Sequence, residues 1–217
     1  MLLGGKIPEI VRLNRQLYLD VNHFAIATPW AHGFMAGYAH LIGIGLLALL
    51  LLIAWWRARS RPNPERSVAK VLWAAGGTII AEGISHDVLK PLIAERRPYL
   101  TLAHVEVLLT RTNGFSFPSG HATIAGAVIV GLWLSRDRLM TLLAILVGVF
   151  LAFGRVYVGM HYPGDVVAGL IFGGLLVWIL SPLGVWLLTK ITRVIHKSSM
   201  TSWLVASSTG AHVHASS

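Results

Sequence analysis

Runs without charged residues alternate along the chain with short charged connections. Four runs free of Asp, Glu, Lys and Arg lie at Val21–Trp56, between Arg111 and Arg136, between Arg138 and Arg155, and between Asp165 and Lys190. Because about 20 apolar residues cross a bilayer as a helix, each run predicts a transmembrane helix. A fifth span is predicted around 68–93, although Glu82, His86 and Asp87 lie in its second half. The pattern predicts an all-α polytopic membrane bundle of about five transmembrane helices.

The amino-terminal region has a different pattern. Apolar residues at Ile10, Leu13, Leu17 and Val21 recur at helical spacing within 7–24, which predicts an amphipathic helix. This helix either lies in the membrane interface or packs against the bundle from the solvent side.

The chain divides into three parts on this pattern. We expect an interfacial amino-terminal region at 1–33, a transmembrane domain at 34–197 and a disordered tail at 198–217. The tail is rich in Ser and Ala and lacks a sustained period, which is typical of disorder.

Composition agrees with a membrane protein. Only 12% of the 217 residues are charged, 55% are hydrophobic, and the mean hydropathy is +0.67. Soluble domains are about a quarter charged. The net charge of +9 is therefore attributed to Lys and Arg that flank the spans, and nucleic acid is excluded as the partner. The absence of cysteine excludes disulfides and thiolate chemistry, and the amino terminus lacks the apolar stretch of a signal peptide.

Basic connections mark one face of the membrane. The segments 57–66 and 135–138, together with the residues from Lys190 onward, hold most of the Lys and Arg outside the polar clusters described next. The positive-inside rule makes this face cytoplasmic. The segment 57–66, RARSRPNPER, is predicted to be a non-helical loop because it contains two prolines.

Three polar clusters fall on the opposite face, where spans begin or end. They are Lys90–Pro98, Phe117–His121 and Gly154–Asp165. Ionisable residues at membrane depth are costly, so each is a functional candidate. Pro118, Ser119 and Gly120 precede an apolar stretch, which predicts a helix amino terminus whose hydroxyl and unpaired N–H groups favour phosphate.

Three cations of these clusters point to the same ligand. Lys90, Arg97 and Arg155 have too few nearby carboxylates to pair them all. An anion is the expected partner, and arginine suits bidentate phosphate binding.

Two histidines complete the candidate chemistry. His161 lies at a bend before Pro163, and Asp165, four residues on, can accept from one imidazole nitrogen, which leaves the other as nucleophile or base. His121 lies one turn into the phosphate-binding helix, where it can donate a proton to a leaving oxygen. Together with the cations, these residues predict phosphoryl transfer through a phosphohistidine.

The motifs that carry this chemistry resemble a known family. Lys90-x6-Arg97-Pro98, Pro118-Ser119-Gly120-His121 and Arg155-x5-His161-x3-Asp165 are similar to the three signature motifs of the type 2 phosphatidic acid phosphatase family. The resemblance covers 68–190 and implies a metal-independent membrane lipid phosphatase that uses no cofactor. It implies that His161 is the nucleophile, Asp165 its orienting partner and His121 the general acid. The phosphate-binding residues would be Lys90, Arg97, Ser119, Gly120 and Arg155.

One position departs from the family pattern. The family usually has Ser before the arginine of the third motif, and this chain has Gly154. We expect the phosphate site to tolerate the change, because that Ser would supply at most one hydrogen bond.

The small size and outward-facing site resemble bacterial undecaprenyl diphosphate phosphatases. We therefore predict hydrolysis of undecaprenyl diphosphate to the monophosphate, in the bacterial inner membrane and on the extracytoplasmic side, which would recycle the cell-wall lipid carrier. The alternatives are a phosphatidylglycerophosphate or phosphatidic acid phosphatase, and a lipid phosphate transporter without hydrolysis. A metal-dependent phosphatase is disfavoured because the clusters hold few carboxylates.

Glu82 and His86 lie four residues apart on the second predicted span. A proton path, a partner for Lys90 and a buried polar pair all fit this spacing. We interpret the pair as structural support rather than as part of the site.

Overall fold

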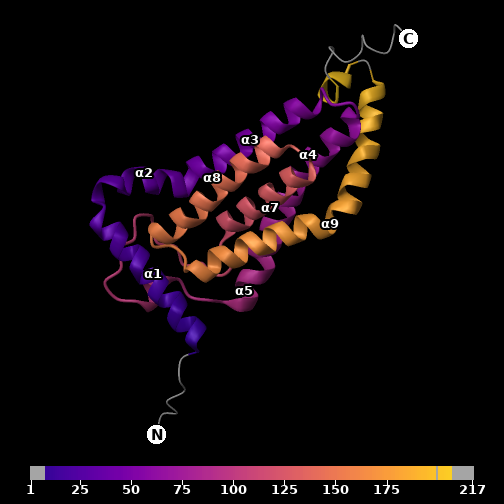
Figure 1. Ribbon diagram of the computed structural model, residues 1–217. Coiled ribbons are helices and arrows are strands. Elements are labelled where there is room, and N and C mark those ends of the chain that lie inside the picture. Colours follow the sequence, from indigo (N-terminus) through magenta and orange to yellow (C-terminus); the bar gives the residue numbers. More distant parts are fainter. Residues whose placement is uncertain (1–7, 199, 207–217) are drawn as a thin grey trace.

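The computed structural model describes residues 8–198 and 200–206, and this part of the chain is helical without strands (Figure 1). The helices are α1 (Glu9–Ala27), α2 (His32–Gly37), α3 (Gly43–Ala58), α4 (Pro64–Ile84), α5 (Lys90–Ile93), α6 (Pro98–Thr101), α7 (Gly120–Leu134), α8 (Arg138–Tyr157) and α9 (Pro163–Lys197). Two π-helices, η2 (Tyr38–Ile42) and η3 (Ser85–Leu89), and two short 3₁₀ turns, η1 (Pro29–Ala31) and η4 (Ser202–Leu204), complete them. The predicted all-α class is confirmed.

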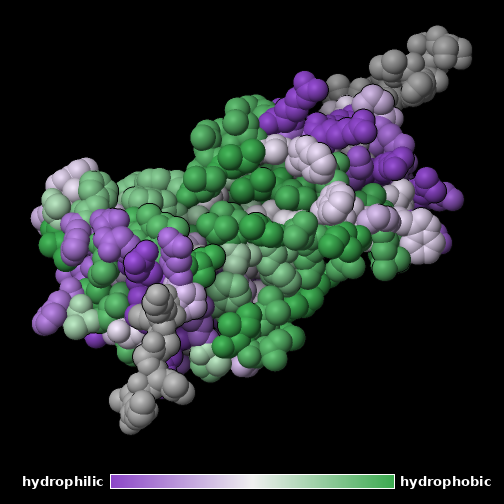
Figure 2. All heavy atoms as spheres, turned by 60° about the horizontal axis from the view of Figure 1, so that its bottom comes forward, coloured by the Kyte–Doolittle hydropathy of each residue, from purple (hydrophilic) through white to green (hydrophobic). Residues whose placement is uncertain are grey.

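Four helical segments are long and apolar enough to cross a membrane. They are Pro29–Ala58, Pro64–Thr101, Arg138–Tyr157 and Pro163–Lys197, and α7 is a shorter apolar helix between the second and third. The 15 residues of α7 rise about 22 Å, which is less than a hydrocarbon core of about 30 Å. On the face that Figure 2 shows, hydrophobic residues fill the middle of the molecule and hydrophilic residues gather toward its two ends. The protein is therefore a multi-pass membrane protein.

Close helix packing places α7 at the centre of the bundle, against α4, α8 and α9. A Cβ atom at Gly126 would collide with the backbone of Leu170 in α9, and one at Gly173 would collide with the carbonyl of Thr123 in α7. Glycines at such positions let helix backbones touch, which is how helices associate in lipid without a hydrophobic driving force. The two helices that begin at the polar clusters, α7 and α9, are thereby held together.

The basic connections meet at one end of the bundle, as predicted. Asp137, at the amino terminus of α8, accepts from the Arg57 Nε at 2.8 Å and lies 3.1 Å from an Arg61 Nη. Burial alone would raise the pKa of Asp137, but the Arg57 hydrogen bond and the two positive charges lower it overall. This ion-pair cluster joins the connection before α4 to the connection before α8.

Two predictions at this end need correction. The segment 57–66 is not entirely loop, because α3 runs to Ala58 and α4 begins at Pro64, where proline fits the first helical position. The Asn63 side chain accepts from the Arg66 N–H at 3.2 Å and caps α4.

The tail also differs from the expected disorder over 200–206, where Val205 is buried. The Trp55 Nε1 donates to the carbonyl of Leu204 at 3.1 Å, and Arg59 donates to that of Trp203 at 2.7 Å. The backbone carbonyls of this segment thus find donors on α3 and the residue after it. Residues 207–217 and 199 lie outside the described part, and with them the rest of this prediction.

At the other end, α1 lies across the bundle and packs against α8 and α9. The Tyr18 side chain is buried and donates to the carbonyl of Gly159, while the Asn22 amide donates to that of Glu106 at 2.8 Å. Ile10 and Leu13 are exposed on the other side of the helix. An apolar stripe turned away from the bundle is what an interfacial helix presents to lipid.

Candidate active site

The three polar clusters come together at the end of the bundle that carries α1. Lys90 begins α5, Arg97 precedes α6, Ser119 precedes α7, Arg155 lies in the last turn of α8, His161 lies between α8 and α9, and Asp165 lies in the first turn of α9. Five of these side chains are buried, those of Arg97, Ser119, Arg155, His161 and Asp165. The structure therefore assembles residues from three sequence regions into one enclosed cluster.

His161 has a different environment at each ring nitrogen. Its Nδ1 lies 3.4 Å from the Asp165 Oδ2, and its Nε2 lies 3.4 Å from the Arg97 Nη1. Proline at 163 begins α9 and places Asp165 in its first turn, where the carboxylate also accepts from the Tyr162 N–H at 2.9 Å. The carboxylate thus occupies one side of the imidazole, and the other side faces cations.

Ser116 is a site residue that the sequence interpretation missed. Its hydroxyl donates to the Asp165 Oδ2 and lies 3.4 Å from the His161 Nδ1. The Ser116 N–H donates to the carbonyl of Glu95 at 2.8 Å, which fixes the segment before α7 to the segment before α6. Ser116 lies three residues before Ser119 in a stretch without helical or strand periodicity, so no pattern marked it.

The two arginines are positioned by backbone carbonyls. Arg97 donates from Nη1 to the carbonyl of Met160 and from Nε to that of Gly114, both at 3.0 Å. Arg155 donates from Nη1 to the carbonyl of Ala39 at 2.9 Å, while its Nε is buried without a hydrogen-bond partner among the described residues. Neutral carbonyls orient the guanidinium groups without cancelling their charge, so the groups keep their attraction for an anion.

Ser119 and Gly120 lie where α7 begins, beside the carboxylate of Glu82. The Ser119 N–H donates to the Asp165 carbonyl at 3.0 Å, and its hydroxyl is buried without a partner in the described residues. A Cβ at Gly120 would collide with the carboxylate of Glu82. Glu82 also lies close enough to Lys90 for the two charges to interact. Glu82 therefore lies beside the cluster, and the interpretation of Glu82 and His86 as structural support stays a prediction.

His121 is half-buried in the first turn of α7, and its Nε2 lies 3.2 Å from the carbonyl of His40 in η2. A π-helix shifts its backbone hydrogen bonds, and such turns are frequent at functional sites. The carbonyls of Ala39 and His40 both lie in η2: that of Ala39 accepts from Arg155, and that of His40 contacts His121. The first span, which carries none of the three motifs, therefore orients two of the predicted site residues.

Electrostatics keep His161 neutral. Burial lowers the pKa of His161 well below 6.5, and the positive charges of Arg155, Arg97 and Lys90 lower it further. A neutral imidazole has a free lone pair on one nitrogen, as a nucleophile or base requires.

No group of three or more His, Asp or Glu side chains is arranged to hold a metal ion within 8–198 and 200–206. The Asp165 carboxylate already accepts hydrogen bonds from the Ser116 hydroxyl and the Tyr162 N–H.

Comparison with known proteins identifies the family. The model of the PAP2 superfamily matches residues 71–188. An undecaprenyl-diphosphatase of Sulfolobus acidocaldarius is 30% identical over 182 residues, which cover 82% of this chain and 79% of that protein. A lipid A 1-phosphatase of Rhizobium etli is 37% identical over 143 residues, 63% of this chain and 61% of that protein. The chain belongs to the PAP2 superfamily.

A solved structure shares the fold. The PAP2-type phosphatidylglycerolphosphate phosphatase of Bacillus subtilis superposes with a TM-score of 0.61 at 22% identity, covering 82% of this chain and 87% of that one. The predicted family and the predicted enzyme class, a membrane lipid phosphatase, are confirmed.

Proposed function

We propose that this protein hydrolyses a polyprenyl diphosphate, undecaprenyl diphosphate in the first place, to the monophosphate and inorganic phosphate through a phosphohistidine. The observation that carries the proposal is the two-sided environment of His161, with a carboxylate at Nδ1 and an arginine at Nε2. A carboxylate that accepts from Nδ1–H fixes the tautomer in which Nε2 holds the lone pair. The nucleophilic atom then faces the cations that would hold the phosphate.

The reaction takes place in two steps, formation and hydrolysis of the phosphohistidine. The Nε2 of His161 attacks the terminal phosphorus, the phosphorus–oxygen bond to the lipid phosphate breaks, and His121 gives its proton to the departing oxygen. His121 then takes a proton from water, the water oxygen attacks the phosphohistidine, and phosphate leaves with His161 restored. Asp165 stabilises the positive charge that the imidazole gains in the first step.

The phosphate is held by charge and by a helix terminus. Arg97, Arg155 and Lys90 supply positive charge, and Arg155 retains a buried Nε without a partner in the described chain. Ser119 and the N–H groups at the start of α7 supply hydrogen bonds. The absence of a side chain at Gly120 leaves room for the Glu82 carboxylate. These groups also stabilise the charge that develops on the transferred phosphoryl group.

The substrate preference is supported by the relative named undecaprenyl-diphosphatase, which this chain matches over 79% of that protein's length. The lipid tail would stay in the bilayer beside the apolar band while the diphosphate reaches the cluster. We place the protein in a bacterial inner membrane with the site on the extracytoplasmic side, because the basic connections lie at the other end of the bundle.

A second candidate is a phosphatase of another membrane lipid. The similarity to the lipid A 1-phosphatase supports a sugar-phosphate lipid, and phosphatidylglycerophosphate and phosphatidic acid belong to the same alternative. The site residues would keep their roles in each case.

The test is phosphate release by the detergent-purified protein from undecaprenyl diphosphate, phosphatidylglycerophosphate, phosphatidic acid and lipid A. We expect the highest kcat/KM on the diphosphate and no release by H161A. Preference for another lipid would replace the substrate and keep the chemistry. Release by H161A at the native rate would contradict the phosphohistidine, and absence of release from every lipid would favour the transport alternative.

A further inference from the structure

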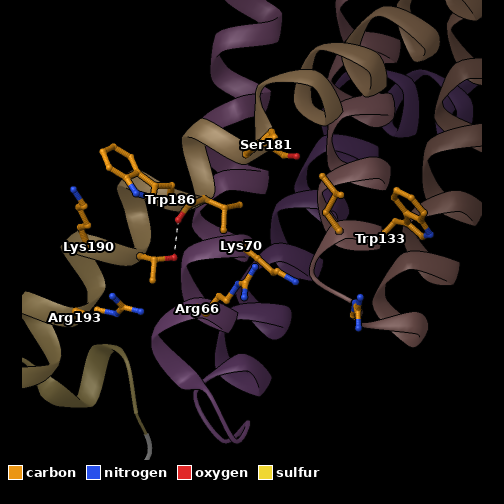
Figure 3. A pocket seen from close by; sticks show the side chains of 12 residues that line it. Arg66, Lys70, Trp133, Ser181, Trp186, Lys190 and Arg193 are labelled. Carbon is orange, nitrogen blue, oxygen red and sulfur yellow. Dashed lines mark hydrogen bonds between the residues drawn. The ribbon is translucent and has the colours of Figure 1, made fainter.

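A second polar site lies at the end of the bundle opposite the active site. A groove of about 610 Å³ opens between α4, α7 and α9 (Figure 3). Five cationic side chains line it, namely Arg66 and Lys70 of α4, Arg136 after α7, and Lys190 and Arg193 of α9. Two helices and the connection after α7 thus bring positive charge to the groove.

A bend in α9 gives the groove its shape. Pro182 lies inside α9 and cannot donate to the carbonyl of Trp178, and the Ser181 hydroxyl donates to that carbonyl instead, at 2.8 Å. The helix changes direction partway along its length (Figure 1), and proline is a usual cause of such a bend. Ser181 and Pro182 both line the groove, so it lies where α9 bends.

The carboxylates at this end have partners outside the groove. Asp137 pairs with Arg57 and Arg61, and Glu65 lies 2.6 Å from the His196 Nδ1. Arg193 interacts with the charge of Glu65 at a distance, without forming a direct ion pair. Within the described residues, none of the five groove cations forms a salt bridge, so their charge is available to an anion.

Two tryptophans show that the groove lies at the membrane interface. Trp133 and Trp186 line it and are 59% and 55% exposed. The Lys190 Nζ lies 3.8 Å from the centre of the Trp186 ring, and Figure 3 shows both side chains on the side of α9 away from Arg66 and Lys70. Tryptophan rings prefer the headgroup level of a bilayer. Exposed Leu183 and Leu187 continue the apolar surface along α9.

We propose that this groove binds the phosphate of an anionic phospholipid, such as phosphatidylglycerol, from the leaflet opposite the active site. The cations would pair with the phosphate, the tryptophans would cover the glycerol region, and the acyl chains would follow the apolar surface of α9. A phospholipid would contact both the cations and the apolar surface of the groove, whereas free phosphate would contact only the cations. The proposal is independent of the proposed function, because no groove residue belongs to the active site.

The experiment uses the full chain in mixed micelles with brominated phosphatidylglycerol or brominated phosphatidylcholine, whose bromines quench tryptophan fluorescence on contact. We expect half-maximal quenching at a lower mole fraction of the anionic lipid. R136Q/K190Q should raise that mole fraction roughly tenfold or more, because each cation near an anionic lipid contributes to its attraction. W133F/W186F should remove the saturable part of the signal.

The matched control is R138Q/K197Q, which removes the same two residue types from the same end of the bundle outside the groove. This control should leave the preference for the anionic lipid unchanged. Elution from size exclusion at the native volume, together with continued phosphate release, would show that each variant is folded. The proposal would be overturned if both lipids quenched equally, or if R138Q/K197Q lost the preference for the anionic lipid to the same extent. It would also be overturned if excess inorganic phosphate displaced the lipid.

Discussion

The guanidinium group of Arg155 donates to the backbone carbonyl of Ala39, 2.9 Å away in a π-helix of the first span. Ala39 lies outside the stretch that matches the family model, which begins at residue 71. A Cβ at Gly154 would lie 3.3 Å from the Ala39 Cβ, so the glycine that departs from the family pattern permits the close approach of this span to α8. The arginine is therefore held by backbone rather than by a carboxylate.

Arg155→Lys should lower kcat/KM about 10- to 100-fold, the effect of losing a hydrogen bond to a charged group. Arginine has several N–H donors in one plane, so it can bind the Ala39 carbonyl and a phosphate at the same time. The single ammonium group of lysine lacks this geometry. Steady-state phosphate release measures the change, with Arg138→Lys at the opposite end as the control. An unchanged kcat/KM would remove Arg155 from the phosphate site.

Ser116→Ala should lower kcat about tenfold while KM changes little, because the hydroxyl positions Asp165 and has no proposed contact with substrate. Ser116→Thr keeps a hydroxyl and should restore part of the rate. Ser67→Ala, at the other end of the bundle, is the matched control. A loss confined to KM would show that Ser116 contacts the phosphate instead.

The depressed pKa of His161 predicts a pH-dependent stability. The unfolded chain binds a proton at this histidine below about pH 6.5, while the folded chain does not. Its contribution to the free energy of unfolding is therefore complete above pH 6.5 and decreases as the pH falls toward the folded pKa. Thermal unfolding in detergent between pH 5 and 8 should show a steeper loss for the native chain than for His161→Gln. Parallel profiles would mean that the imidazole is charged in the folded protein.

Gly126→Ala should destabilise the bundle by about 1–3 kcal/mol, because the new methyl collides with the Leu170 backbone in α9. Gly76→Ala in α4 is the control, since nothing lies within 4 Å of its added Cβ and alanine favours a helix by about 0.5–1 kcal/mol. Thermal unfolding of both variants tests this contrast. Equal stability would contradict the close packing of α7 and α9.

Phosphate release should persist after treatment with EDTA, since the proposed mechanism uses two histidines, cations and a helix terminus. Activity lost on chelation and restored by a divalent cation would contradict the phosphohistidine mechanism.

The sequence predicted the all-α membrane fold because apolar runs leave local signals, and the same kind of signal marked the motif residues, whose roles stay predictions. Apolar runs of membrane length identify helices, and Pro163 and Pro118 mark the bends that place His161 and Ser119. Ser116, Ala39 and His40 left no such signal, because their contacts join distant segments through a loop hydroxyl and backbone carbonyls. The ordered turn at 202–204 was missed for the same reason, since its partners Trp55 and Arg59 lie far away in the chain.

The contact between α7 and α9 also limits how a lipid can reach the site. Where Gly126 and Gly173 bring the two backbones together, no space is left for a hydrocarbon chain. A lipid diffusing in the bilayer cannot pass sideways between these helices to reach His161. A lipid that reaches His161 from the bilayer therefore has to approach it from another side of the bundle.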